Sequence, residues 1–166
     1  GDTAEVGSVW PSDAENSDSF EVREAFLTYN LPFMDATVKA GKFPTLLGYE
    51  VLKTQDNFNH NISHAMLFGF AVPFTNTGVM LSAPLGDMAG IDLAVVNGWD
   101  NVKDNNNSPS IMGGFGLTPS DMISTYVAAI YGGESDPIDG TKAPGAAGAG
   151  EKRFAVTANA TLTLSE

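Results

Sequence analysis

The feature that most constrains the fold is a period-two pattern over the eleven residues from Phe154 to Leu164. Successive side chains of a β-strand point to opposite faces, so this pattern predicts a strand with one apolar and one polar face. A strand of this length suits a tilted crossing of a bilayer, whereas strands of soluble proteins average about five or six residues. The apolar face includes Val156, Ala158, Ala160 and Leu162, and the polar face includes Thr157, Asn159 and Thr161.

Six other segments are expected to be strands, and five of them alternate in the same way. They are residues 20–31, 36–43, 77–84, 90–99, 110–117 and 122–131. In segment 90–99 the pattern places Trp99 on the same face as Ile91 and Leu93. Segment 122–131 is apolar on both faces, so its orientation stays open.

The connections between these segments alternate in length. The short ones are residues 32–35, 85–89 and 118–121, and the long ones are 44–76, 100–109 and 132–151. Up-and-down outer-membrane barrels have tight turns at one rim and longer loops at the other. A Greek-key sandwich has no reason to alternate strictly. The predicted fold class is therefore all-β, an antiparallel up-and-down transmembrane β-barrel.

The expected number of strands is seven, which is odd, whereas bacterial single-chain barrels have an even number and at least eight. We therefore expect residues 1–166 to form a single barrel segment that is part of a larger barrel. Residues 1–19 are polar and are expected to be an external loop or a lead-in.

Composition excludes several classes of protein. Twenty acidic residues against eight basic ones give a net charge of −12, which argues against nucleic-acid binding because that needs a positive surface. The chain has no cysteine, so disulfides and thiolate chemistry are excluded. A transmembrane helix is not expected, because no apolar run reaches about 18 residues.

Three motifs resemble sites that carry chemistry, and each is better explained as ordinary structure. His60 and His64 have helical metal spacing but lie in an expected loop with no third ligand. The segment 100–107 is rich in Asp and Asn but lacks the pattern of an EF-hand loop, so a solvated external loop is favoured over a calcium site. The glycine-rich run 113–116 could suggest a phosphate-binding loop, but no Lys-Ser or Lys-Thr follows it, so glycine on the inner face of a barrel strand is the better explanation. We expect no catalytic residue, no metal and no cofactor.

Aromatic residues fall at the expected strand ends. Trp99, Tyr131 and Phe154 lie beside long connections, and Tyr29 and Phe33 flank a short one. Amphipathic rings at both ends of membrane strands form girdles at the level of the lipid headgroups. The sequence favours two such girdles over the ordinary occurrence of aromatics at strand ends.

Several motifs resemble those of a known family. They are Glu24–Asn30 (EAFLTYN), Lys39–Phe43 (KAGKF), Leu47–Glu50 (LGYE), Leu67–Thr75 (LFGFAVPFT) and Val95–Asn101 (VVNGWDN). Together they resemble the bacterial outer-membrane porins of the second beta-barrel porin family, well over residues 20–119 and more loosely beyond. The resemblance implies an outer-membrane channel for small solutes and a chain longer than this one. By analogy with other porins, it also implies a homo-oligomer such as a trimer.

Charged and polar residues on the expected inner faces are candidates for lining the pore. They are Glu24, Thr28, Lys39, Asp92, Thr157, Asn159 and Thr161. The connection 44–76 is too long and too apolar for a plain external loop, so part of it is expected to fold inward. Tyr49, Glu50 and Lys53 would then form a constriction that faces Lys39 and Glu24. Residues 67–74 are expected to extend the next strand.

These expectations favour passive diffusion of small solutes or ions through a barrel in contact with outer-membrane lipid. One alternative is a soluble or secreted β-sandwich that acts as a binding module. Another is a non-conducting barrel that serves as a sheath or anchor for a partner protein.

Overall fold

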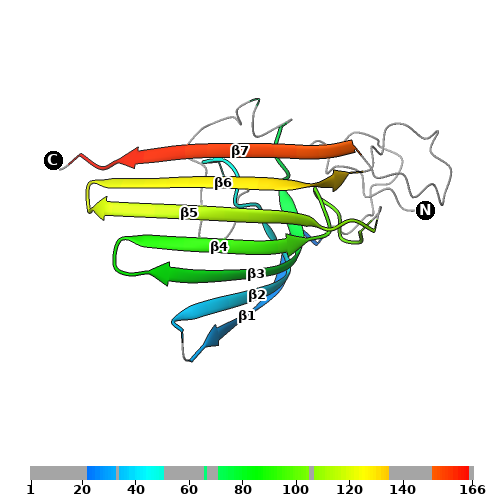
Figure 1. Cartoon of the computed structure of the whole chain (residues 1–166), viewed down its shortest axis with the longest axis horizontal. Helices are drawn as coiled ribbons and strands as arrows, with labels where there is room; N and C mark the ends of the chain where they lie inside the picture. Colours follow the sequence, from blue (N-terminus) through cyan, green and yellow to red (C-terminus); the bar gives the residue numbers. More distant parts are fainter. Residues whose placement is uncertain are drawn as a thin grey trace.

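The computed structural model describes residues 22–32, 34–50, 66, 71–104, 107–134 and 151–164. These residues form seven strands in one sheet (Figure 1). The strands are β1 (Ala25–Leu31), β2 (Ala36–Pro44), β3 (Thr75–Leu85), β4 (Ala89–Val96), β5 (Ser110–Ser120), β6 (Ile123–Glu134) and β7 (Glu151–Leu162).

Each strand pairs antiparallel with the strand that precedes or follows it in the chain, so the sheet order is β1 to β7. This confirms the predicted all-β, up-and-down fold and the number of strands. Within the described residues, β1 and β7 do not pair with each other, so they are the two edges of the sheet.

Several predicted strand limits were wrong. Strand β7 begins at Glu151 because its hairpin with β6 extends to the pair Glu134 and Glu151. Strand β4 ends at Val96 because the backbone turns through Gly98, with φ of 106°, and Asp100, with φ of 55°. Strand β3 begins at Thr75, and residues 71–74 are not part of it, contrary to the predicted extension; residues 67–70 lie outside the described residues.

One face of the sheet, which we call the outer face, is apolar and exposed. Leu27 on β1 is 81% exposed, and Leu93 on β4 and Phe115 on β5 are also exposed. The same face carries further exposed apolar residues on β3 to β7, namely Val79, Val95, Ile111, Val127, Val156 and Leu162. An apolar surface that extends over a whole sheet is far larger than a soluble monomer exposes, so it needs an apolar environment.

The opposite face, which we call the inner face, has two halves. Near the long connections it buries an apolar cluster made of Phe43, Leu47, Val72, Met80, Ala94, Val96, Met112, Ala128 and Ile130. Near the short turns it is polar, with Ser82, Asp92 and Tyr126 in contact. Strand β6, whose orientation the sequence left open, turns Tyr126, Ala128 and Ile130 inward and Val127 outward.

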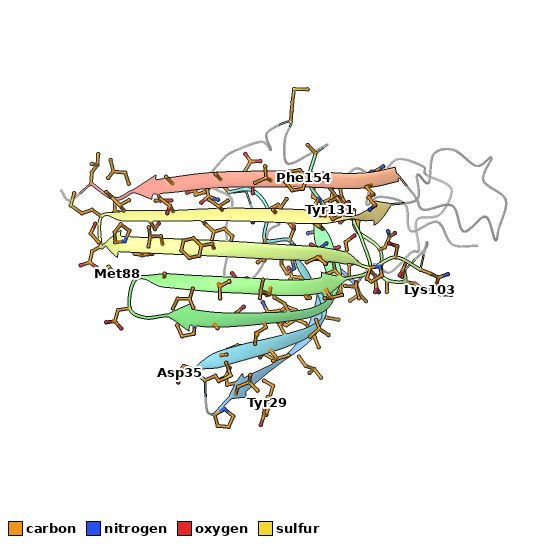
Figure 2. All side chains as sticks on the ribbon, in the orientation of Figure 1. Tyr29, Asp35, Met88, Lys103, Tyr131 and Phe154 are labelled. Atoms are coloured by element: carbon orange, nitrogen blue, oxygen red, sulfur yellow. The ribbon has the colours of Figure 1, made fainter. Side chains whose placement is uncertain are left out.

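The short turns lie together at one end of the sheet, as Figure 1 shows for β1–β2, β3–β4 and β5–β6. Figure 2 places Asp35 and Met88 at this end and Lys103 at the other. Each short turn carries an aspartate, namely Asp35, Asp87 and Asp121. No helix among the described residues combines the length and the hydropathy that spanning a membrane would require.

Part of the predicted pattern of aromatic residues agrees with the structure. Tyr131 and Phe154 are direct cross-strand partners on the outer face, near the long connections (Figure 2), and Tyr29 is exposed on the outer face near a short turn. Trp99 does not share the outer face with Leu93. It packs against the buried cluster of the inner face, because the chain turns at Gly98 just before it. Phe33 lies outside the described residues.

Candidate functional site

A short segment that follows β2, residues 45–50, lies across the inner face. The backbone N–H of Gly48 donates to Thr157 Oγ1 at 2.9 Å, and Asn159 Nδ2 donates to the Gly48 carbonyl oxygen at 3.5 Å. The segment leaves β2, near one edge of the sheet, and meets β7 at the other edge, as its cyan trace behind β6 and β7 in Figure 1 shows. The sheet therefore curves around this face.

Apolar packing holds the same segment in place. Leu47 is 1% exposed and belongs to the buried cluster of the inner face, to which Met80, Met112 and Ile130 contribute from three different strands. Burial of a leucine side chain contributes about 1.5–3 kcal/mol. The crossing segment is thus anchored by both a side chain and its backbone.

The loop after β4 is ordered by a half-buried carboxylate, that of Asp100. Asp100 Oδ1 accepts hydrogen bonds from the backbone N–H groups of Phe74, at 2.8 Å, and Thr75, at 2.7 Å. Burial raises the pKa of Asp100 above its ordinary value, and the hydrogen bonds from Thr75 and Phe74 counteract this only in part. The carboxylate therefore organises the backbone at the start of β3.

In the part of the chain that the structure describes, no three His, Cys, Asp or Glu side chains come together in a way that could hold an ion. His60 and His64 lie outside the described residues.

Asp92 is the central polar residue of the inner face near the short turns. Its Oδ2 accepts a hydrogen bond from the Tyr126 hydroxyl at 2.7 Å, and its Oδ1 accepts one from the Ser82 hydroxyl. Ser82 lies directly opposite Asp92 on β3, whereas Tyr126 reaches it from β6 across the intervening strand β5. Both carboxylate oxygens are therefore held in fixed positions.

Tyr126 can cross β5 because that strand carries glycine beneath the ring. A Cβ atom at position 114 would lie 2.0 Å from the Tyr126 hydroxyl oxygen, and one at position 116 would lie 3.3 Å from the ring. Gly114 and Gly116 are on the inner face, as the sequence predicted for a glycine in a barrel strand. Their role in seating Tyr126 was not predicted, since the pattern alone gives no pairing register.

Beside Asp92 the inner face is hollowed. The hollow has a volume of about 360 Å³ and opens widely to solvent. Ser82, Asp92 and Tyr126 line it, together with Asp35 and Thr37. The described basic residues of the inner face are directed elsewhere: Lys39 Nζ lies 4.8 Å from the centre of the Phe26 ring, and the Arg153 guanidinium lies 5.5 Å from that of Trp99.

The other candidate residues are placed as follows. Thr28 and Lys39 are cross-strand partners on the inner face, and Thr161 lies opposite Ser124 near the short turns. Glu24 directly precedes β1 and is half-buried. In the crossing segment Tyr49 is exposed and Glu50 is half-buried, while Lys53 lies outside the described residues. Gly48, which precedes Tyr49, is hydrogen-bonded to Thr157 and Asn159 on β7. Lys39 lies on β2, near the other edge of the sheet.

Comparison with known proteins identifies the family. The model of the family described as "Putative beta-barrel porin-2, OmpL-like" matches residues 2–166. The chain belongs to this family. The match covers nearly the whole chain, including the region beyond residue 119 where the motifs resembled the family more loosely. No curated protein and no solved structure shows significant similarity to the chain.

Membership of the beta-barrel porin-2 family gives the two faces of the sheet a common explanation. In this family the sheet is the wall of a β-barrel, and the apolar outer face is the side that suits contact with membrane lipid. The inner face then borders the interior of the barrel, which in such proteins is the polar side.

Proposed function

We propose that the chain forms part of an outer-membrane porin that allows passive diffusion of small solutes or ions. The observation that carries this proposal is the contrast between the two faces of the sheet. The outer face carries exposed apolar residues on β1 and on β3 to β7, while the inner face near the short turns presents Asp92, Thr161 and other polar groups. A soluble β-sandwich would bury its apolar face against a second sheet, so this contrast disfavours that alternative.

Lining of the pore is assigned to the inner-face residues predicted from the sequence, Glu24, Thr28, Lys39, Asp92, Thr157, Asn159 and Thr161. The crossing segment 45–50 supports a narrowing of the lumen, since its Gly48 is hydrogen-bonded to two of these residues on β7. Tyr49 and Glu50 would border the narrowed passage, and Lys53 follows them in the sequence. Porins use inward-folded segments and lumen charges in this way to set selectivity.

Conductance of the full-length protein in planar lipid bilayers tests this function. We expect discrete channels in the wild type, and wider and less selective channels after deletion of residues 47–59. An equally long deletion, of residues 135–147 in another long connection, serves as the matched control and should leave the conductance nearly unchanged. Equal conductance in all three proteins would show that the crossing segment does not constrict the pore.

One observation favours a second candidate function. The inner face near the long connections is apolar and covered by Leu47 and Val72, which a barrel closed by its own loops or by a partner protein would also show. A non-conducting barrel that acts as a sheath or anchor would give no channels in the same bilayers. Assembly into trimers is proposed by analogy with other porins, and cross-linking in intact membranes tests it.

A further inference from the structure

We propose that Asp92 makes this pore prefer cations, with Tyr126 and Ser82 as positioning residues. This inference rests on the proposed pore function and names the class of solute that the inner face favours. Asp92 is distinct from the crossing segment and acts through the field of a single carboxylate fixed on the barrel wall.

The first step is that the carboxylate is held in place. Tyr126 donates to Oδ2 at 2.7 Å and Ser82 donates to Oδ1, so neither oxygen can turn away from the hollow without breaking a hydrogen bond. Hydrogen bonds to a charged group are shorter and stronger than those between neutral groups. Both hydroxyls also keep acceptor lone pairs that an ammonium group or a hydrated ion can use.

The second step is that no basic side chain neutralises this carboxylate. Among the described residues Asp92 forms no ion pair, and its side-chain partners are the two hydroxyls. The side chain of Lys39 points along β2 toward Gly41, because it lies over the ring of Phe26, the cross-strand partner of Gly41. Asp92 lies in the opposite direction from Lys39, since it is aligned across the strands with Ser82 and Thr37. Arg153 lies against Trp99 near the long connections.

The third step is access. Asp92 lines the open hollow of about 360 Å³, in which Gly90 and Gly116 offer no side chain that could shield it. Asp35 borders the same hollow, so both charged residues that line the hollow, Asp35 and Asp92, are negative. In the lumen of the proposed pore, fixed charge on a low-dielectric wall raises the local concentration of the opposite ion.

Reversal potentials across a gradient of potassium chloride test the proposal. The wild-type pore should prefer potassium to chloride, and Asp92→Asn should lower the permeability ratio about threefold, as expected for loss of one charge acting across several ångströms of water. Asp87→Asn removes the same charge from an exposed turn and is the matched control, with a smaller change expected. Asp92→Glu keeps the charge and should retain most of the preference.

The positioning role has its own readout. Tyr126→Phe leaves the charge of Asp92 but removes one hydrogen bond, so the permeability ratio should fall by less than in Asp92→Asn while the conductance stays comparable. A ratio equal to that of the wild type would overturn the role of Tyr126.

The main claim fails if Asp92→Asn conducts with the wild-type permeability ratio, or if Asp87→Asn lowers the ratio as much. Circular dichroism and resistance to protease establish that each variant is folded. If the wild type itself forms no channel, the proposed pore function fails and this inference fails with it, which is a different result from a channel without cation preference.

Discussion

At the scale of single residues, the position of the Tyr126 side chain depends on two glycines of the neighbouring strand. Its ring crosses β5 to reach Asp92, and the space for it exists because Gly114 and Gly116 lie beneath it. The neighbouring Gly113 faces the other side of the sheet, where an added Cβ atom would meet nothing closer than 3.7 Å. Adjacent glycines of one strand therefore have different structural requirements.

This difference predicts unequal effects of alanine at the two positions. Gly114→Ala should lower the free energy of unfolding by about 1–3 kcal/mol, because the new methyl group overlaps Tyr126. Gly113→Ala should change it by less than about 0.5 kcal/mol. Urea unfolding in lipid vesicles measures both, and equal values would mean that Tyr126 does not rest on Gly114.

Asp100 predicts a dependence on pH with a defined sign. Its folded-state pKa is raised above 3.8, so the closed loop binds more protons than the open loop between that value and the raised one. The free energy of opening contributed by Asp100 therefore decreases as the pH rises through this window, and is constant above it.

Hydrogen exchange of the Phe74 and Thr75 amides reports this opening, because both donate to Asp100. Their protection factors should fall as the pH rises through the window in the wild type. In Asp100→Asn, which keeps an acceptor oxygen but cannot titrate, they should be independent of pH. A wild-type protection that increases with pH would contradict the raised pKa.

At the scale of elements, β7 is the strand whose two faces differ most plainly. Ala158 lies near the middle of the strand on the exposed outer face, and Thr161 lies on the opposite face toward the short turns. Ala158→Arg should cost about 2–4 kcal/mol if position 158 is near the bilayer midplane, and Thr161→Arg should cost much less. Unfolding in vesicles distinguishes the two, and equal tolerance would invalidate the assignment of the faces.

The strands were predictable because period-two alternation reports which side chains share a face, and six of the seven carry it clearly. Strand β6 could not be oriented, since it presents apolar residues on both faces: Ile130 packs on the inner cluster while Val127 is exposed. Ile130 is buried and Val127 is not because Leu47, from the segment that crosses the inner face, packs in the same cluster as Ile130. Such packing depends on contacts between distant parts of the chain.

The candidate site was predictable only as a set of faces. Alternation placed Asp92, Thr157 and Asn159 on polar sides of their strands, and the pairing shows them on the inner face. The contact between Tyr126 and Asp92 spans 34 positions in the sequence and depends on the register of three strands, which hydrophobic pattern alone does not define. The packing of Arg153 on Trp99 was missed for the same reason.

At the scale of the whole molecule, the two ends of the sheet are expected to lie on opposite sides of the membrane. Residues 1–166 contain no cysteine, so an introduced cysteine is the single thiol within this part of the protein. Lys103→Cys, near the long connections, should react with a membrane-impermeant maleimide in intact cells, and Asp87→Cys, in a short turn, should react only after the cells are opened. The reverse pattern would mean that the topology is inverted.

The pairing of each strand only with its neighbours in the chain has a consequence for how such a wall can change size during evolution. Duplication or loss of one hairpin preserves the direction of every other strand, whereas a single added strand would reverse all the strands after it and exchange their rims. Single-chain bacterial barrels have even strand numbers, as growth by hairpins produces. Barrel diameter rises with the number of strands. Homologous barrels that arose by gain or loss of hairpins are therefore expected to differ in diameter by discrete steps, each step corresponding to two strands.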